Sequence, residues 1–496
     1  MRLKEIHSDK KDGRAKMRVV ARGDMMHEGI DYDRTFSPTV KYTSLRAACA
    51  IAAERDMDIS GGDITQAYVR ADWPSGVPLY AHKFADGYND HGPNGEKLAI
   101  AIGNLYGKPD SGRNLNSKLD ATFKDEIKMG GMTLTRSEYD HSVYFRWEGN
   151  NLMLVLLYVD DLLIFADKGC DMRVRFMDTF KTLFPVEDFG EEIGTLHEFL
   201  SIRIVKSPHS VCLDSERYIT ELAAEMFPGG VHAQFAVPAT VELPKLVEDA
   251  TRNKDQPSRL DKHLVTRYRR LVGAMLYVST TTRPDITYAV GMTSRCLAYP
   301  TPELLAAAER VLIYLVCTRS LRLTYTGGDM ERQVTARWAP TIGTTLEGKS
   351  DANWQVARST SGFVFEKTHA AISWGMKKQQ SIALSTFEAE TMAASLACCE
   401  AVWLRNLFEE LGFPPAGPTV LYLDNSAAID LAHDPVHHAS AKHIKRRELF
   451  IRELVADNVI KPIYVKTADN TADIFTKPLD RKVFQKHRDK LLGITE

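Results

Sequence analysis

The spacing of hydrophobic and polar residues changes twice along the chain. In residues 1–205, apolar runs of strand length alternate with helical patterns, which predicts a mixed region of strands and helices. Residues 238–260 are rich in Pro, Asp, Glu, Lys and Asn and hold few large apolar residues, so we expect a solvated connector there. Apolar residues then recur at helical spacing, which predicts helices at residues 268–276, 289–299 and 301–315.

A further polar connector, residues 327–348, precedes a C-terminal region of strands and helices. Short apolar strands are expected at residues 362–365, 371–374 and 420–423, with a long helix before the last of them. We therefore predict the α/β fold class and three domains, at residues 1–205, 206–330 and 345–496. The middle domain is expected to be mainly helical.

Composition narrows the class of protein. The chain has 496 residues, of which 44% are hydrophobic and 26% charged, as in globular proteins and unlike disordered or fibrous ones. Its 63 Lys and Arg against 65 Asp and Glu leave a formal charge of −2, so binding to a polyanion would need local basic patches. The 7 cysteines have no CxxC spacing and no paired framework, which favours a reducing compartment.

The sequence lacks the patterns of a secreted or membrane protein. Its first residues do not form the apolar run of a signal peptide. The longest apolar stretch, residues 152–166, is interrupted by Asp160 and Asp161 and is therefore not a membrane span. We expect an intracellular protein without a membrane partner.

Two apolar runs of strand length flank Asp160 and Asp161, which predicts a hairpin with acids at its tip. Adjacent carboxylates in apolar surroundings repel each other and lose hydration, so they need raised pKa values or a counter-cation. Mg²⁺, which binds carboxylates, water and phosphates, would make the pair a phosphoryl-transfer site. The competing interpretation is a turn that favours Asp. Asp63, at an expected strand end, is a third acid that can reach this tip.

The C-terminal region carries a second set of acids near strands and helix starts. Three of them are Asp351, Asp424 and Asp473. The fourth is either Glu388 or Glu390. Ser385 and Glu388 form a capping-box pattern, in which the Glu388 carboxylate reaches back to the Ser385 backbone N–H. Because this gives Glu388 a structural role, we select Glu390, at the border of the helix's apolar stripe.

Lys442 and Arg446 place positive charge on successive turns of an expected helix, which suits phosphate contacts that do not depend on base sequence. A solvated helix face is the competing interpretation. Histidines nearby lack a cysteine and a standard ligand spacing, so we do not expect zinc at His433, His437, His438 and His443.

Several motifs together resemble one family. Residues 158–161 (YVDD) look like the active-site box of retroelement reverse transcriptases. Other segments are similar to the Ty1/copia type, in family order, at residues 18–23 (RVVARG), 29–32 (GIDY), 36–41 (FSPTVK), 44–46 (SLR) and 105–107 (LYG). The resemblance implies right-hand polymerase fingers and palm in residues 1–205, a helical thumb and connection in 206–330, and an RNase H-like α/β domain in 345–496.

The resemblance also implies two metal-dependent active sites. The palm site would be formed by Asp63, Asp160 and Asp161. The RNase H site would be formed by Asp351, Glu390, Asp424 and Asp473. Each would bind two Mg²⁺ ions, with Mn²⁺ as the alternative ion, and the second site would cleave the RNA strand of an RNA–DNA hybrid.

Substrate contacts follow from the same resemblance. Tyr68 stands where the family has an aromatic steric gate against a nucleotide 2′-hydroxyl, with core packing as the competing interpretation. Lys16 and Arg22 resemble the fingers residues that grip the triphosphate, with surface solvation as the alternative. Tyr158 of the YVDD box belongs to the same substrate-binding set. Backbone contacts to the template–primer are expected from Arg267, Arg269 and Arg270.

The sequence departs from the family's pattern in residues 107–113, which follow it only loosely, and at two positions that involve glycine. Gly61 and Gly62 stand before Asp63 where larger residues are usual, and since glycine weakens a strand we expect the metal geometry to suffer. Ser201 stands where a glycine is expected, which would alter a turn and its primer contact.

The sequence thus predicts an RNA-directed DNA polymerase with a C-terminal ribonuclease H. Its partners would be an RNA template, a DNA primer, dNTPs and the RNA–DNA hybrid. By resemblance, its location would be a cytoplasmic virus-like particle with later nuclear entry. Two alternatives stay open: a catalytically inactive retroelement relic that only binds nucleic acid, and a nuclease whose polymerase half is a scaffold.

Overall fold

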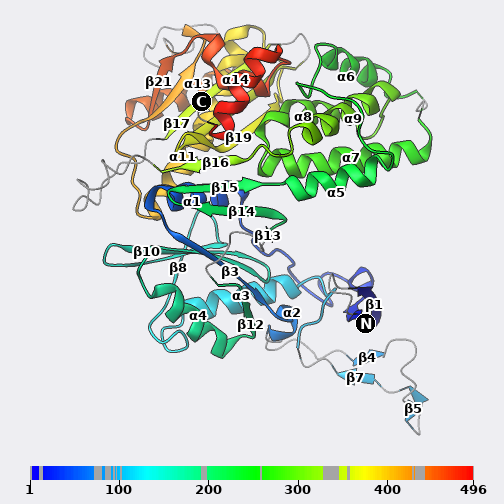
Figure 1. Cartoon of the computed structure of the whole chain (residues 1–496), viewed down its shortest axis with the longest axis vertical. Coiled ribbons are helices and arrows are strands. Elements are labelled where there is room, and N and C mark those ends of the chain that lie inside the picture. Colours follow the sequence, from blue (N-terminus) through cyan, green and yellow to red (C-terminus); the bar gives the residue numbers. More distant parts are fainter. Residues whose placement is uncertain are drawn as a thin grey trace. The chain divides into compact units, whose positions relative to one another are not determined.

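The computed structural model describes residues 3–9, 15–71, 81–83, 91–92, 95–96, 98–100, 103–190, 198–256, 260–327, 346–354, 358–426, 429 and 442–494. They form two compact units of mixed helix and strand, which confirms the predicted α/β class (Figure 1). The first unit comprises Met1–Lys41 and Asp58–Glu192, and the second comprises Tyr42–Met57 and Ile193–Glu496. None of the described helices combines the length and the apolar character that a membrane span requires.

The first unit is built on a six-stranded antiparallel sheet with the strand order β12-β3-β11-β10-β9-β8. In sequence order these strands are β3 (Asp58–Ile64), β8 (Thr135–Arg136), β9 (Val143–Glu148), β10 (Asn151–Tyr158), β11 (Asp161–Ala166) and β12 (Val186–Asp188). Smaller strand pairs are β1 (Leu3–Asp9) with β2 (Ala15–Ala21), β4 (Ala81–Lys83) with β7 (Leu98–Ile100), and β5 (His91–Gly92) with β6 (Gly95–Glu96). A 3-10 turn, η1 (Gly23–Met25), follows β2.

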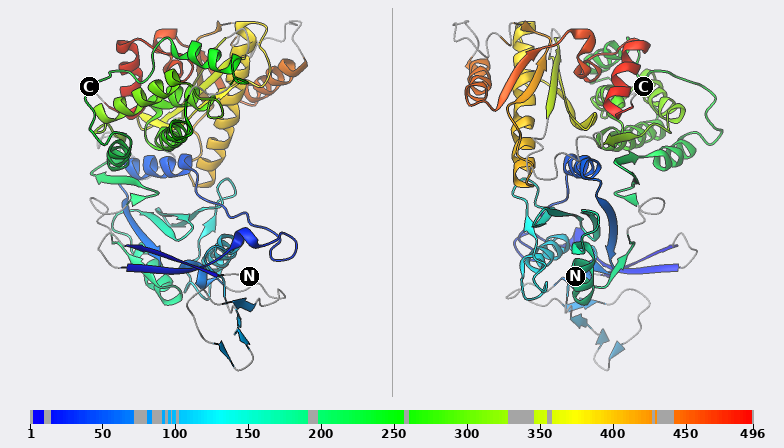
Figure 2. Two further views of the ribbon diagram at one scale, coloured as in Figure 1. Left: turned by 90° about the vertical axis from the view of Figure 1, so that its right-hand side faces the viewer. Right: turned by 60° about the vertical axis from the view of Figure 1, so that its left-hand side comes forward.

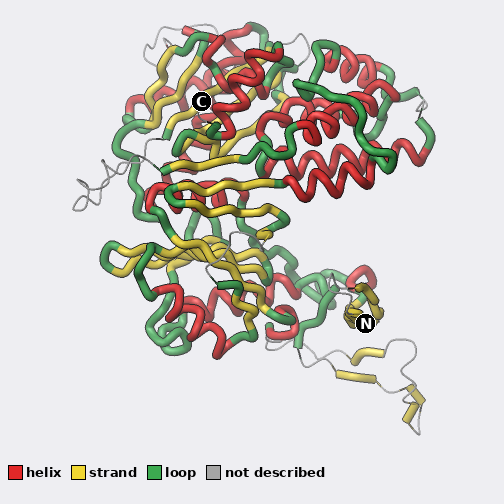
Figure 3. The backbone as a smooth tube through the Cα atoms, in the orientation of Figure 1, coloured by secondary structure: helices red, strands yellow, loops and turns green. Residues whose placement is uncertain are grey.

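Helices α3 (Ser111–Lys124) and α4 (Met172–Leu183) cover one face of this sheet (Figure 3). Phe123 of α3 packs against Phe176 and Phe180 of α4, with ring centroids 5.8 and 5.5 Å apart. Alternate residues of β10 and β11, including Val155 and Ile164, complete this core. The short helix α2 (Ala67–Arg70) follows β3.

Gly61 and Gly62 do not interrupt β3. The strand pairs with β11 along one edge and with β12 along the other, and both glycines lie within these ladders. A Cβ atom at Gly62 would lie 3.2 Å from a Val186 methyl group, so the missing side chain lets β12 approach closely. The backbone that leads to Asp63 is therefore held on both sides, contrary to our expectation of a loosened strand.

The second unit contains two sheets. The antiparallel sheet has the order β13-β14-β15-β16, with β13 (Glu198–Phe199), β14 (Ile202–Ser207), β15 (Ser210–Asp214) and β16 (Leu323–Thr326). The mixed sheet has the order β19-β18-β17-β20-β21, with β17 (Glu347–Asn353), β18 (Thr360–Lys367), β19 (Ala370–Lys378), β20 (Thr419–Leu423) and β21 (Ile460–Tyr464).

The helices of the second unit surround these sheets. Those before the mixed sheet are α1 (Tyr42–Arg55), α5 (Glu216–Met226), α6 (Leu243–Arg252), α7 (Lys262–Thr281), η2 (Pro284–Ile286), α8 (Thr287–Ser294) and α9 (Pro302–Cys317). Those that follow are α11 (Thr386–Glu410), α13 (Lys442–Ala456), η3 (Thr467–Asp469), η4 (Thr471–Phe475) and α14 (Arg481–Leu492). Figure 2 shows α11 as a long helix along the mixed sheet.

One hydrophobic core joins the helical block to the mixed sheet. It includes Met275 of α7 and Leu312 of α9 together with Val364 of β18 and Phe475 of η4. On the opposite face of the sheet, Ala352 packs with Met392 of α11. Helix α11 and the turn η4 therefore approach the sheet from opposite faces.

Helix α1 is tied into this unit by a buried arginine. The guanidinium of Arg46 donates hydrogen bonds of 2.7 Å to the carbonyl oxygens of Ile372 and Thr280 and lies 3.9 Å from the ring of Trp374. Burial lowers the pKa of Arg46 to about 10. Arg46, part of the SLR motif, thus has a structural role.

Ser201 lies in the two-residue turn between β13 and β14, where Phe199 pairs with Ile202. Leu200 and Ser201 have φ angles of 57° and 61°, in the left-handed region that glycine adopts at low cost. The family's glycine fits this turn, and Ser201 adopts the same kind of backbone with strain.

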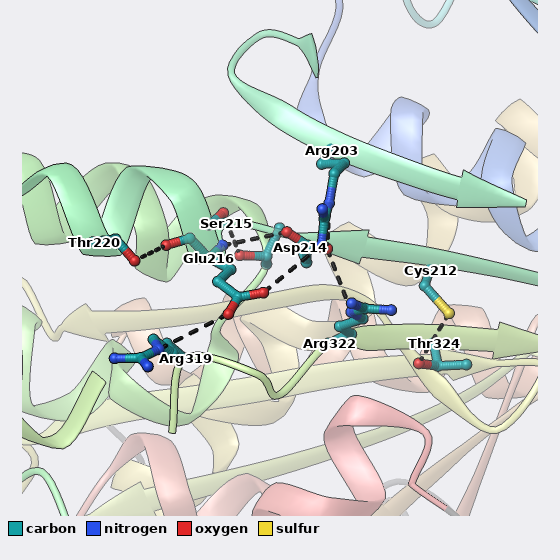
Figure 4. A network of polar contacts seen from close by, with 10 residues as sticks. Arg203, Cys212, Asp214, Ser215, Glu216, Thr220, Arg319, Arg322 and Thr324 are labelled. Carbon is teal, nitrogen blue, oxygen red and sulfur yellow. Dashed lines mark hydrogen bonds and ion pairs between the residues drawn. The ribbon is translucent and has the colours of Figure 1, made fainter. Parts of the chain in front are cut away.

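The antiparallel sheet carries a network of ion pairs at its junction with α5 (Figure 4). The buried carboxylate of Asp214 accepts contacts from Arg203 at 2.7 Å and from Arg322 at 3.3 Å. Glu216, the first residue of α5, lies 3.8 Å from Arg319. The network fixes the ends of three strands to the start of this helix.

Candidate active sites

Three carboxylates of the first unit converge at the end of its sheet. Asp161 begins β11 and pairs in register with Asp63 of β3, while Asp160 lies in the turn that joins β10 to β11. The backbone N–H of Ile64 donates a 2.9 Å hydrogen bond to the Asp160 carbonyl oxygen, which ties the turn to β3. One carboxylate oxygen from each aspartate lies within 4.8 Å of the others, close enough for ligands of one cation.

The turn that carries Asp160 is strained. Val159 has φ 58°, and a β-branched residue in the left-handed region costs about 1–2 kcal/mol. The ladder between β10 and β11, which continues to the Tyr158–Asp161 pair, holds this conformation. The strain therefore fixes where the Asp160 side chain leaves the backbone.

The electrostatics of this group favour a cation. Burial and, to a smaller extent, the charges of Asp160 and Asp63 together raise the pKa of Asp161 to about 6. At neutral pH Asp161 is mostly ionised, so three negative groups face each other. A divalent cation would offset this repulsion.

Two tyrosines stand beside the acids. The rings of Tyr68 and Tyr106 meet edge to face with centroids 5.1 Å apart, and the Arg18 guanidinium lies 5.7 Å from the Tyr106 centroid. Burial, followed by the charge of Asp160, raises the pKa of both phenols, so both rings lie near that carboxylate. Tyr68 is half-buried, lies beside the acids and also packs against the hydrophobic core, and Tyr158 is half-buried at the end of β10.

The two residues predicted to contact the triphosphate, Arg22 and Lys16, differ in what the structure describes. Arg22 is exposed and forms two hydrogen bonds to Asp24, at 3.2 and 2.6 Å, so its charge is already paired. Lys16 belongs to β2, and its side chain lies outside the described residues.

A second carboxylate group lies at the end of the mixed sheet. Asp351 of β17 is 2% exposed, Glu390 of α11 is 9% exposed, and Asp424 directly follows β20. One carboxylate oxygen from each lies within 4.8 Å of the others. The Ala352 N–H donates to Glu390 Oε1 at 3.3 Å, and the Thr467 hydroxyl donates to Asp424 at 3.1 Å. These bonds orient the acids toward one another.

Asp473 lies next to this group without being one of the three. It is buried in η4, and its carboxylate pairs with Lys477 at 2.9 Å. The Thr476 hydroxyl donates to the Asp351 carboxylate, which connects η4 to β17. Asp473 therefore lies close enough to Asp351 for their carboxylates to interact, and its role as a metal ligand stays a prediction.

Burial dominates the electrostatics of the second group. It raises the pKa of Glu390 to about 9, with further contributions from Asp351 and Asp424. It also raises the pKa of Asp473 to about 7, with Asp351 next, and raises the pKa of Asp424. Glu390 therefore keeps its proton at neutral pH unless a cation replaces that proton.

The choice between Glu388 and Glu390 agrees with the hydrogen bonds. The Ser385 hydroxyl accepts from the Glu388 N–H at 3.2 Å, as the capping pattern predicts. The Glu388 carboxylate accepts from the Leu384 N–H at 2.8 Å, one residue before the N–H of Ser385 that we predicted. Glu388 is thus used in capping, and Glu390 faces the strand acids.

Comparison with known proteins identifies the family. Residues 2–228 match the family described as Reverse transcriptase (RNA-dependent DNA polymerase). The chain is 31% identical over 98% of its length to the Retrovirus-related Pol polyprotein from transposon TNT 1-94 of Nicotiana tabacum, and 31% identical over 99% to that from transposon RE1 of Arabidopsis thaliana. The chain belongs to the Ty1/copia-type Pol polyproteins.

This Pol chain spans about a third of the length of these relatives, 35% and 31% respectively. Among solved structures, that of the foamy viral protease-reverse transcriptase in complex with double-stranded DNA covers 94% of the Pol chain and 66% of its own chain. Its sequence identity is 11% and its TM-score 0.47, so the family assignment depends on the sequence comparisons.

The basic residues expected to contact the template–primer also have partners within the chain. All three lie in the second unit: Arg267 binds Glu309 at 2.8 Å, Arg270 binds Glu225 at 2.9 Å, and Arg269 donates to the Leu297 carbonyl at 2.8 Å. Arg446 is exposed on α13. The side chains of Lys442 and His443 lie outside the described residues, as do His433, His437 and His438.

Sequence reasoning missed the groups that support the acids. Lys477 lies four residues after Asp473, an (i, i+4) spacing that could have suggested the pair. Thr467 and Thr476 carry no such signal, because their hydrogen bonds depend on how η3 and η4 meet the strands. Tyr106 was noted only as part of the LYG motif.

Proposed function

We propose that this Pol chain is an RNA-directed DNA polymerase that also has a ribonuclease H site, with an RNA template, a DNA primer, dNTPs and RNA–DNA hybrid as partners. The observation that carries the proposal is that two carboxylate groups, one in each unit, each bring three ligand oxygens within 4.8 Å. Assignment of fingers and palm to residues 1–205, thumb and connection to 206–330, and the RNase H-like domain to 345–496 is part of this proposal.

The residues fit Mg²⁺ or Mn²⁺. Both groups offer only carboxylate oxygens, the donors that these cations prefer. Burial and the charges of the neighbouring carboxylates raise the pKa values of Asp161 and Glu390, and a bound cation would offset both effects. When bound, the cations would polarise the attacking hydroxyl or water and offset charge on the leaving group.

In the first unit, the protein would contribute to the reaction by fixing the positions of the three aspartates. Register fixes Asp63 opposite Asp161, and the turn at Val159 fixes Asp160. The Tyr68 and Tyr106 rings bound the space beside Asp160, where a nucleotide sugar would meet an aromatic edge. That arrangement supports Tyr68 as the steric gate. From the family resemblance, we include Tyr158, Arg22 and Lys16 as further substrate contacts.

In the second unit, hydroxyl and cationic groups set the acids. Thr476 and Thr467 hold Asp351 and Asp424, and the Ala352 N–H holds Glu390. Lys477 offsets part of the negative charge next to Asp473. We include Asp473 in the site, together with phosphate contacts from Lys442 and Arg446.

Two assays on one protein test this proposal. Primer extension on poly(rA) with oligo(dT) should require Mg²⁺ and disappear in Asp160→Asn, which should still cleave RNA–DNA hybrid. Asp424→Asn should show the reverse, so each variant is the folded control for the other. Hybrid cleavage without any DNA synthesis would support the nuclease with a polymerase scaffold. Two blank assays with salt-sensitive hybrid binding would support the inactive relic.

A further inference from the structure

Three cationic residues meet at one end of the mixed sheet: Arg295, Arg358 and Lys378. Lys378 ends β19 and pairs in register with Thr360, which begins β18 and pairs in turn with Asn353 of β17. Arg295 directly follows α8, and its Nη2 donates a 3.0 Å hydrogen bond to the Thr360 hydroxyl. Arg358 precedes Thr360 by two residues.

The packing of α8 explains why Arg295 reaches this end of the sheet. Gly291 and Arg295 are four residues apart and share one helix face. Gly291 lies so close to Met376 that a Cβ atom would collide with its sulfur. Met376 and Lys378 point to the same face of β19. Contact at Gly291 therefore places Arg295 beside the row that contains Lys378.

The cluster has no internal counter-charge. Among the residues that the structure describes, no carboxylate pairs with Arg295, Arg358 or Lys378. Burial lowers the pKa of Arg295. Burial, then the charges of Arg295 and Arg358, lowers the pKa of Lys378. A partly buried guanidinium that has lost water without gaining a carboxylate is unfavourable, and an anion from outside the chain would relieve this cost.

The cluster is adjacent to the second acidic group. Asp351 and Asn353 lie on the same face of β17, and Asp351 pairs with Gly362 in the row next to Asn353 and Thr360. Successive rows on one face are roughly 7 Å apart along a strand. The cations thus lie on the Asp351 face of the sheet, one row further along.

We propose that Arg295, Arg358 and Lys378 bind a backbone phosphate of the RNA–DNA hybrid whose neighbouring phosphodiester lies at Asp351, Glu390 and Asp424. This inference rests on the proposed ribonuclease H function and adds a contact from α8, outside residues 345–496. A guanidinium group can donate two parallel hydrogen bonds to the oxygens of one phosphate. Such contacts position a duplex without reading its base sequence.

Binding of a fluorescent RNA–DNA hybrid to the full chain in EDTA tests the site without cleavage. Arg295→Gln and Lys378→Gln should each raise Kd about tenfold and lower the slope of log Kd against log salt by about one. Arg295→Lys, which keeps the charge, should recover much of the affinity. Lys377→Gln removes the same charge from the opposite face of β19 and should change Kd less than twofold.

Each outcome decides between the site and the function. Unchanged Kd and salt slope in Lys378→Gln and Arg358→Gln, two exposed positions that should not affect folding, would overturn the site even if Asp424-dependent cleavage is present. Weakened binding in the variants without Asp424-dependent cleavage in the parent would support the site and overturn the nuclease. A parent chain that does not bind hybrid would overturn both.

Discussion

The two carboxylate groups of this Pol chain have similar spacing but different construction. The first is formed by a hairpin and its neighbouring strand, and all three aspartates are half-buried. The second brings together acids from two strand segments and a helix, and two of them, Asp351 and Glu390, are buried. The pKa values differ accordingly, about 6 for Asp161 and about 9 for Glu390.

The difference teaches how burial controls metal affinity. Carboxylates must be deprotonated to bind a cation, so a buried acid with a raised pKa couples metal binding to proton release. Near neutral pH, Asp161 of the first group is mostly ionised, whereas Glu390 of the second group holds a proton. We therefore expect two activities on one chain with different responses to pH.

The largest expected effect separates the two groups by substitution. Asp161→Asn should lower DNA synthesis about a thousandfold and leave hybrid cleavage unchanged, because it removes a ligand from one group only. Glu390→Gln should do the reverse. Steady-state rates of both variants in both assays measure this, and a Glu390→Gln chain with impaired DNA synthesis would break the comparison.

The next effect is the pH dependence of the Mg²⁺ requirement. Between pH 8.5 and pH 6.5, the Mg²⁺ concentration for half-maximal hybrid cleavage should rise up to about a hundredfold, since each unit below the Glu390 pKa costs about tenfold. For primer extension the rise should be less than about twofold, because the Asp161 pKa lies below this range. Equal shifts in the two titrations would contradict the comparison.

A smaller effect is expected from removing the positive charge next to the second group. Lys477→Ala removes the cation that pairs with Asp473 and should lower hybrid cleavage about tenfold and shift its pH optimum upward, because the acids then hold protons more tightly. Lys486→Ala removes an exposed lysine that pairs with Asp469 and is the matched control. Similar pH profiles for parent and Lys477→Ala would show that Lys477 has only a structural role.

The smallest effect concerns the strained turn of the first group. Val159→Gly removes the steric strain of the left-handed backbone but also makes the turn more flexible. Because these two effects oppose each other, the free energy of unfolding should change by less than about 1 kcal/mol. DNA synthesis should fall several-fold and hybrid cleavage should not change. Ser201→Gly, a similar relief at a turn away from the acids, should stabilise by up to about 1 kcal/mol in denaturant unfolding.

Features of the two sites that depend on neighbouring residues in the sequence could be predicted from the sequence. The hairpin at Asp160 follows from two apolar strand-length runs, and the role of Glu388 follows from a capping box. The closure of the first acidic group was expected because Asp63, at a strand end, can reach the hairpin tip, whereas the closure of the second was implied by the family resemblance.

Other features depend on contacts between distant segments and leave no local signal. Arg267 and Arg270 looked available for nucleic acid, but their glutamate partners lie 42 and 45 residues away in sequence. The sequence did not predict a role for Arg295, because only the packing of α8 against β19 brings this residue near Lys378 and Arg358. The structure does not show the loosened strand expected from Gly61 and Gly62, since β12 closes on the space that they leave.

The central claim is that the chain has two independent cation sites, each built from its own carboxylate group. Equilibrium binding of Mn²⁺ at pH 8, followed by the electron paramagnetic resonance signal of the free ion, tests this without requiring catalysis. We predict two classes of sites in the parent chain, of which Asp160→Asn removes one and Asp424→Asn removes the other. A Mn²⁺ stoichiometry that is unchanged in both variants would contradict the account.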